Sequence, residues 1–177
     1  MKKFIAVGCL LALFSLSAMA AENDYPKAEF FGGYQYSHLS GTGNANGFNF
    51  AFNGNFSNTL GITADFGAAY QSQGGINYHN YTYTFGPVLS LRANKAYTPF
   101  VHALIGGDHG SASASVAGTT VTGTGNGFAL LAGGGVDFNV SQHIAFRAAQ
   151  ADWMMVHGNG GTSGKNFRYS AGLVFRY

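Results

Sequence analysis

Residues 47–56 read GFNFAFNGNF, and this stretch decides the fold. Phenylalanine occupies alternate positions with small or amide side chains between, which is the period of a β-strand rather than of a helix. One face carries Phe48, Phe50, Phe52 and Phe56, and the other carries Asn49, Ala51, Asn53 and Asn55. A strand buried in an apolar core would leave these amides without hydrogen-bond partners. The pattern therefore predicts a strand with lipid on one face and a polar interior on the other.

The last residues of the sequence repeat this alternation. Apolar and aromatic side chains face one way from residue 167 to residue 177, and Arg168 and Arg176 face the other way. Six further segments alternate in the same manner, although less regularly. The eight predicted strands cover residues 27–38, 47–56, 60–70, 80–92, 98–108, 127–139, 144–155 and 167–177.

The seventh predicted strand breaks the alternation. Phe146 and Trp153 both belong on the lipid face, which places Arg147 and Asp152 on the inner face. An odd number of positions separates the two aromatic residues, however, and strict alternation would put them on opposite faces. One extra residue between them restores the pattern, so we predict a β-bulge near Ala148–Ala149.

After Ala20 no stretch approaches the roughly 20 apolar residues of a membrane helix. A closed barrel is the other structure that satisfies its backbone in lipid. The predicted fold class is therefore all-β, a transmembrane up-and-down antiparallel β-barrel of eight strands. The connections alternate between short ones at residues 57–59, 93–97 and 140–143 and long ones at residues 39–46, 71–79, 109–126 and 156–166. The long ones are rich in Gly, Ser, Thr and Asn, and we predict that they are flexible loops outside the cell.

The N-terminus has the features of a secretory signal peptide. Lys2 and Lys3 precede an apolar run at residues 4–16, and Ala18-Met19-Ala20 forms a small-x-small cleavage pattern. Export and a barrel fold together predict a location in the outer membrane of a Gram-negative bacterium. The predicted division of the chain is a cleaved signal peptide at residues 1–20, a periplasmic leader at residues 21–26 and the barrel at residues 27–177.

The composition of the mature chain excludes several classes of function. Removal of the signal peptide leaves seven basic and seven acidic side chains, so the protein has no basic field for nucleic acid. The only cysteine, Cys9, lies in the signal peptide, which rules out a disulfide framework and a thiolate metal site in the mature chain. We expect no cofactor.

Residues 27–177 resemble the small outer-membrane barrels of the OmpA and OmpX type, in the porin-like outer-membrane β-barrel family. The resemblance rests on the eight alternating segments and on the final strand, YSAGLVFRY. It implies that the barrel assembly machinery recognises the C-terminal pattern, that outer-membrane lipid is the other partner, and that the protein is a monomer. The residues that match the spacing of this assembly signal are Tyr169, Leu173, Phe175 and Tyr177.

Charged side chains on the inner face are expected to pair. An eight-stranded barrel is only wide enough for its own side chains to fill it, and an unpaired charge in that space is costly. The predicted lumen network comprises Glu29, Asp65, Asp137, Asp152, Arg92, Arg147, Arg168 and Arg176. Strand order predicts the pairs Glu29–Arg176, Asp137–Arg147 and Asp152–Arg168. A salt-bridged plug is the simpler interpretation, and a selectivity constriction or proton path is the alternative.

Outward tyrosine and tryptophan residues near strand ends are expected at the headgroup level, where both an apolar ring and a polar tip are satisfied. These predicted interfacial aromatics are Tyr34, Tyr36, Tyr70, Tyr81 and Trp153. The six histidines lack the spacing of a metal motif. His157 with Ser163 and His109 with Ser111 remain generic candidate pairs for a hydrolase.

Three hypotheses of function follow. The first is a non-enzymatic outer-membrane barrel with a structural or surface-contact role through its loops, and with no catalytic or metal residues. The second is a small porin that passes small solutes. The third is a lipid-modifying enzyme with a site at the barrel rim. Barrels of this build serve different functions, so the fold alone does not separate them.

Overall fold

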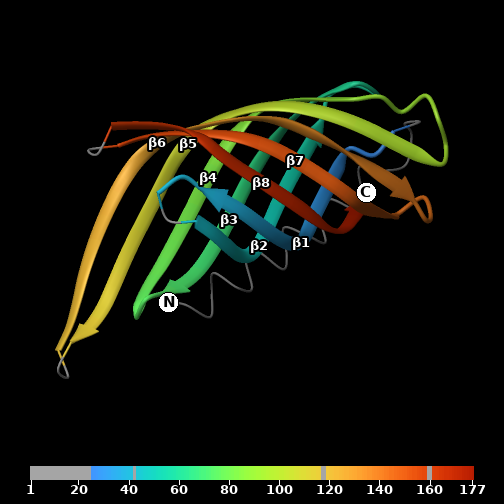
Figure 1. Ribbon diagram of the computed structural model, residues 1–177. Helices are drawn as coiled ribbons and strands as arrows, with labels where there is room; N and C mark the ends of the chain where they lie inside the picture. The colour runs from blue at the N-terminus through green and yellow to red at the C-terminus, as the bar shows by residue number, and fades with distance from the viewer. Residues whose placement is uncertain (1–24, 42, 117–118, 159–160) are drawn as a thin grey trace, which may run out of the picture.

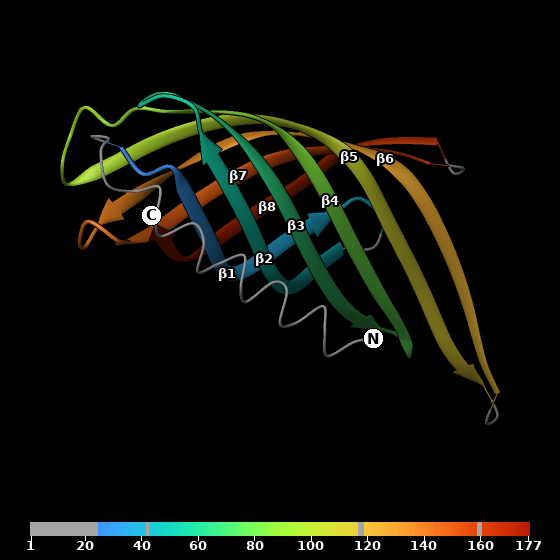
Figure 2. The same cartoon turned by 180° about the vertical axis from the view of Figure 1, so that it is seen from behind.

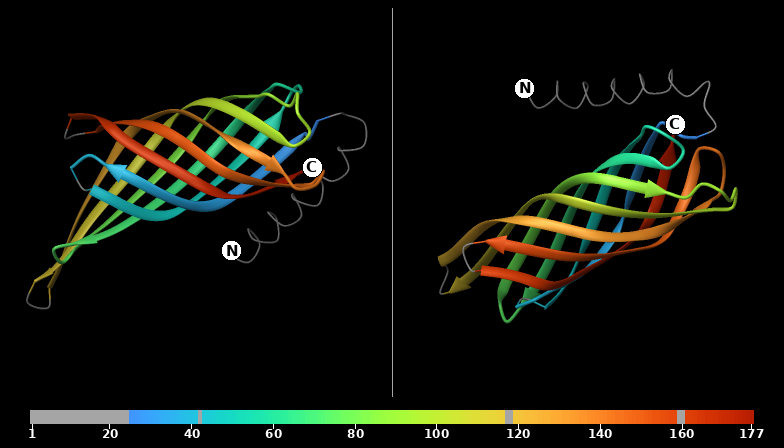
Figure 3. Two further views of the ribbon diagram at one scale, coloured as in Figure 1. Left: turned by 45° about the vertical axis from the view of Figure 1, so that its right-hand side comes forward. Right: turned by 90° about the horizontal axis from the view of Figure 1, so that it is seen from above.

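The computed structural model describes residues 25–177 except for residues 42, 117–118 and 159–160. Eight strands pair in chain order into a closed antiparallel barrel and run obliquely around it (Figures 1 and 3). The strands are β1 (Ala28–Leu39), β2 (Gly43–Asn55), β3 (Leu60–Gln73), β4 (Ile76–Ser90), β5 (Tyr97–Val116), β6 (Thr119–Asn139), β7 (Ile144–Gly158) and β8 (Gly161–Arg176).

The predicted eight-stranded all-β fold is confirmed. The predicted signal peptide lies outside the described residues, and among those described no helix is long and apolar enough to cross a membrane.

The two faces of the strands differ as the alternation predicted. On β2, Phe50 and Phe52 are 53% and 37% exposed on the outside, whereas Asn49 and Asn53 are buried inside. The same division holds around the barrel, where large apolar side chains cover the outer face. An outward apolar surface of this extent is what a lipid environment requires.

β1 and β8 close the barrel. Their register places Glu29 opposite Arg176, and a backbone hydrogen bond from Lys27 N to Tyr177 O at 2.6 Å extends the pairing. We call the end with Ala28 and Arg176 the terminus end. The opposite end, where the turns after β1, β3, β5 and β7 lie, is the hairpin end.

The prediction of four long flexible loops was wrong. Those segments continue as paired strands, and β5 and β6 extend to Val116 and from Thr119. Between β3 and β4 only Gly74 and Gly75 remain, both with positive φ, as a type I′ turn requires. Threonine is common in strands, and pairing satisfies the backbone, so a polar composition can give hairpins as well as loops. The β5–β6 hairpin reaches farthest from the barrel (Figures 1 and 2).

The predicted β-bulge in β7 is confirmed. Arg147 pairs with Gly172 on β8, and Gln150 pairs with Ser170. An advance of three residues along β7 therefore matches an advance of two residues along β8. The same irregularity appears toward β6, where the register shifts between Val136 and Asp137. A second shift, which the sequence did not reveal, lies between Met154 and Val156.

Deletion of Ala148 should prevent folding. Without the extra residue, the side chains on one side of the bulge must turn over, which carries Arg147 or Asp152 toward lipid. An arginine at the membrane midplane costs about 2–4 kcal/mol. We expect the deletion variant to lose the folded band in gel electrophoresis without boiling, while Ala148→Ser, which keeps the residue count, retains it. A deletion variant that folds as stably as the wild type would contradict the role assigned to the bulge.

Candidate functional site: the side-chain network of the lumen

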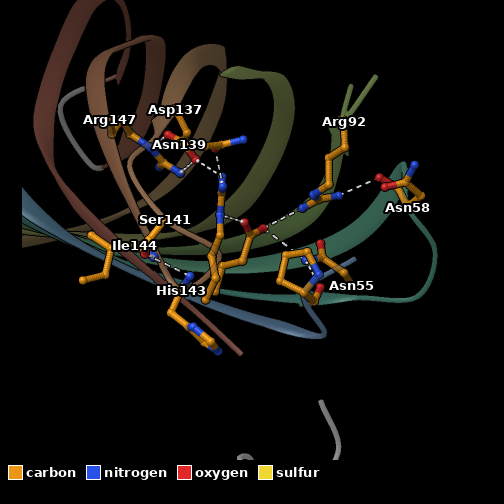
Figure 4. A network of polar contacts seen from close by, with 12 residues as sticks. Asn55, Asn58, Arg92, Asp137, Asn139, Ser141, His143, Ile144 and Arg147 are labelled. Atoms are coloured by element: carbon orange, nitrogen blue, oxygen red, sulfur yellow. Dashed lines mark hydrogen bonds and ion pairs between the residues drawn. The ribbon is translucent and has the colours of Figure 1, made fainter. Parts of the chain in front are cut away.

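Ion pairs cross the lumen at the terminus end. The Glu29 carboxylate lies 2.7 Å from Arg176 Nε and 2.7 Å from Arg92 Nη2. Asn55 Nδ2 donates to Glu29 at 3.0 Å, and Arg92 Nη1 donates to the carbonyl of Asn58 at 2.7 Å. Figure 4 shows Asn55, Arg92 and Asn58 on one side of this end of the barrel. Glu29 is only 3% exposed, and its charge is balanced by two guanidinium groups.

Asp137 and Arg147 form a second group beside the first (Figure 4). Arg147 Nε and Nη2 donate to the two carboxylate oxygens of Asp137 at 2.7 and 3.1 Å, the bidentate geometry that gives strong pairs. The guanidinium also lies against two rings, 4.4 Å from the centroid of Phe31 and 4.2 Å from that of Phe100. Arg176 Nη2 lies 3.4 Å from Asp137, which connects the two groups.

Arg168 is the centre of a third group, farther from the terminus end. Its Nη1 donates to Asp65 at 2.7 Å and its Nε donates to Asp152 at 2.8 Å. The second oxygen of Asp152 lies 2.7 Å from His102 Nε2, and Asn49 Nδ2 donates to Asp65 at 3.0 Å. Arg168 is 1% exposed, so both carboxylates are needed to compensate the loss of its hydration.

Gln150 joins these groups into one network. Its Oε1 accepts a hydrogen bond from Arg147 Nη1 at 2.7 Å, and its Nε2 donates to Asp152 at 2.8 Å. In a regular strand, residues 147 and 150 would point to opposite faces. The β7 bulge brings both side chains into the lumen, so it is the bulge that makes the network continuous.

Two glycines leave the space that this network occupies. A Cβ at Gly133 would lie 2.2 Å from Asp152 Oδ1, and a Cβ at Gly67 would lie 2.7 Å from Gln35 Oε1 and 3.0 Å from Arg168 Nη1. Any larger residue at Gly133 or Gly67 would therefore collide with members of the network.

The lumen becomes apolar on the hairpin side of the network. Buried residues from β5, β6 and β7 pack there, and two partly buried residues from β1 and β7 lie against them. The apolar layer consists of Leu104, Ala129, Leu131 and Met154, with Leu39 and Val156. Strand β5 shows the order of the layers, because His102 belongs to the network, Leu104 to the apolar layer and Asp108 to the space beyond it.

The structure brings the eight charged residues of the predicted network together. It forms the three pairs expected from strand order, Glu29–Arg176, Asp137–Arg147 and Asp152–Arg168. It also forms three pairs that were not predicted, Glu29–Arg92, Asp65–Arg168 and Asp137–Arg176. None of them joins neighbouring strands, so no register argument could have found them.

Sequence reasoning also missed the parts played by His102 and Gln150. Both side chains lie in the lumen, but their partners depend on the curvature of the barrel and on the bulge. The apolar layer was missed as well, because its members come from different strands and no single strand shows them as a group.

The predicted interfacial aromatics lie on the outer face, toward the hairpin ends of their strands. Tyr34 is 56% exposed, the rings of Tyr70 and Tyr81 meet at 6.0 Å, and Trp153 Nε1 donates to the carbonyl of Gly164 at 2.6 Å. Tyr36 is also exposed there. The residues of the predicted assembly signal, Tyr169, Leu173, Phe175 and Tyr177, are likewise exposed on the outside.

Histidines near the hairpin end bind across the strand pairs. His157 Nδ1 lies 2.6 Å from Thr162 Oγ1, and His109 Nδ1 lies 2.6 Å from Asn126 Oδ1. Each imidazole thus contacts a residue other than the serine considered for it. Within the described part of the chain, no three His, Cys, Asp or Glu residues are grouped so that they could hold a metal ion.

Comparison with known proteins finds relatives of this architecture. The family model described as outer membrane protein beta-barrel domain matches residues 6–175. Ail, the attachment invasion locus protein of Yersinia pestis, is 21% identical with a TM-score of 0.63, over 86% of this chain and 99% of Ail. Neisserial surface protein A is 15% identical with a TM-score of 0.63, over 88% and 100% of the two chains. OprG from Pseudomonas aeruginosa is 11% identical with a TM-score of 0.59, over 86% and 96%. No curated protein sequence matches significantly.

Replacement of Arg168 by Met should destabilise the barrel by about 3–5 kcal/mol, because Asp65 and Asp152 lose their shared cation. Urea unfolding in detergent micelles, followed by the fluorescence of Trp153, the only tryptophan, measures the loss. Combining Arg168→Met with Asp65→Asn and Asp152→Asn should recover much of it. Lys165→Met, which removes an exposed cation from the same strand, serves as the control and should change stability by less than about 0.5 kcal/mol. An unfolding midpoint for Arg168→Met equal to that of the wild type would refute this assignment.

Proposed function

Because this chain belongs to the outer-membrane β-barrel family, we propose that it is an integral protein of the bacterial outer membrane with a closed lumen and a surface-contact role. The terminus end faces the periplasm, and the hairpin end faces the exterior. The barrel anchors the hairpins and catalyses no reaction. Side chains close the middle of the lumen, so the protein stabilises the envelope and presents the hairpins without passing solutes.

The separation of the two ends of the lumen supports this proposal. A cavity of about 730 Å³ lies at the terminus end and is lined by Arg92, Asn139 and Arg176 among others. A second cavity, of about 500 Å³, lies at the hairpin end above Leu39 and Val156. The two share no lining residue, and the ion-pair network and the apolar layer lie between them. A solute would have to displace both layers to cross.

The β5–β6 hairpin supports the surface-contact role. β4 pairs with β5 as far as Ala114, whereas β7 pairs with β6 only from Gly127 onward. Among the described residues, the segment 119–126 of β6 therefore pairs on one side only, with β5. Its sequence, TTVTGTGN, has no charge and no proline, which are the usual protections of a free edge. We propose that a partner adds a strand to this edge.

The outer face supports the remaining parts of the proposal. On the lipid side, a groove of about 660 Å³ is bordered by the rings of Phe50, Phe66 and Phe85. Acyl chains of outer-membrane lipid fill it. The aromatic face of β8, which ends at Tyr177, serves the barrel assembly machinery during biogenesis. Closure of β1 on β8 leaves no free strand edge within the membrane, so we propose a monomer.

The wild-type protein should show no steady conductance in planar lipid bilayers, because side chains cross the lumen in two layers. A variant with alanine at Leu104, Arg147, Gln150 and Met154 removes four large side chains from these two layers. If it migrates as a folded barrel, it should give open-channel currents and show that the assay detects an open lumen. Reproducible channels from the purified wild type would instead favour a small porin.

Shortening the β5–β6 hairpin should abolish contact without unfolding the barrel. Ala112 and Gly123 pair directly, so replacing residues 113–122 by Asn-Gly joins them through a two-residue turn. We expect bacteria with this variant to lose adhesion to a cultured cell monolayer. Val121→Lys keeps the hairpin but places a charge at an exposed position on the edge, and should lose adhesion too. Adhesion equal to wild type in both folded variants would exclude the edge as the contact site.

A further inference from the structure

The cavity at the hairpin end has the features of a ligand site. Its volume is about 500 Å³, within the usual range for a small-molecule pocket. Leu39 and Val156, the two partly buried members of the apolar layer, line it and form its floor. The inner faces of β4, β5 and β6 form much of its wall.

Glycine creates this space. Gly110, Gly123 and Gly125 line the cavity, and a Cβ built at any of them would meet no other atom within 4 Å. Their φ angles lie outside the left-handed region, so the backbone does not require glycine there. Larger side chains would fit at these positions and fill the cavity. The choice of glycine at these positions therefore leaves space that larger residues would occupy.

Asp108 lies in the wall of this cavity without a cation. It is 7% exposed, and its Oδ2 accepts a hydrogen bond from Asn80 Nδ2 at 2.6 Å. The other described carboxylates, Glu29, Asp65, Asp137 and Asp152, all form ion pairs. Asp108 forms none with any described residue, although burial of a charge without compensation is unfavourable. A cation is the chemical group that this carboxylate lacks.

We propose that the cavity binds a small organic ammonium ion with an apolar body. The ammonium group donates to Asp108, which Asn80 holds in place, and the apolar body lies on Leu39 and Val156. A bare divalent metal fits less well, because one carboxylate and one amide provide too few oxygen ligands. A neutral solute would leave the negative charge of Asp108 without a counter-charge. Since the apolar layer closes the floor, the ligand enters and leaves from the hairpin end.

Benzylammonium and benzyl alcohol are suitable probes, because they differ mainly in the charge of the polar group. Isothermal calorimetry on the barrel in lipid nanodiscs should show saturable binding of benzylammonium, with benzyl alcohol about tenfold or more weaker, as for the loss of one charge-assisted hydrogen bond. Asp108→Asn should weaken benzylammonium binding by a similar factor. Gly125→Leu should abolish binding of both probes by filling the cavity.

Thr122→Leu is the matched control, since it adds the same side chain to the same strand outside the cavity lining, and it should leave binding unchanged. Equal affinity for the two probes, or binding that persists in Asp108→Asn, would overturn the proposal, as would binding unaffected by Gly125→Leu. Each variant is first checked for folded gel migration. This proposal rests on the closed lumen, but the two are tested separately. Calorimetry tests ligand binding, whereas conductance in planar bilayers tests whether the lumen is closed.

Discussion

The pairing of charges inside the barrel is the constraint on which the rest of the structure depends. Lipid excludes formal charge from the outward-facing positions of the strands within the membrane. All four arginines of the chain and four of its carboxylates consequently face one another in the lumen, where eight strands leave no room for free solvation. A buried ion pair gains little over apolar packing, but a broken one is costly. The network therefore specifies the register of the strands more than it adds to their stability.

The β7 bulge shows how this constraint shapes the backbone. Phe146 and Trp153 must both meet lipid, whereas Arg147 and Gln150 must both meet the lumen. A regular strand cannot satisfy both requirements, and one extra residue at Ala148–Ala149 resolves the conflict. The same residue gives Gln150 its position between Arg147 and Asp152. A local irregularity thus joins two groups of charges that would otherwise be separate.

Much of the fold followed from the sequence because alternation is a local signal. Alternation was enough to predict the number of strands, the face on which each side chain lies, the bulge and the three ion pairs between neighbouring strands. Each of these features depends on residues in one strand or in two adjacent ones. The contact of Asp65 with Arg168 and the apolar layer around Leu104 depend instead on which strands face each other across the lumen. That information lies in the tilt and closure of the barrel. The hairpin end was mispredicted because Gly, Ser and Thr are compatible with both loops and exposed strands.

The two ends of the barrel are stabilised in different ways. At the terminus end, side chains join strands that are distant in the sequence, as Glu29 does with Arg92 and Arg176. Beyond the apolar layer, the strands are joined mainly by backbone pairing and by contacts between partners in register, such as His109 with Asn126. Side chains there contribute little to the choice of fold, so they are free to serve binding. Glycine at positions 110, 123 and 125 and an unpaired carboxylate at Asp108 are tolerated for this reason. The part of the barrel that determines the fold is thereby separated from the part that is able to change with function.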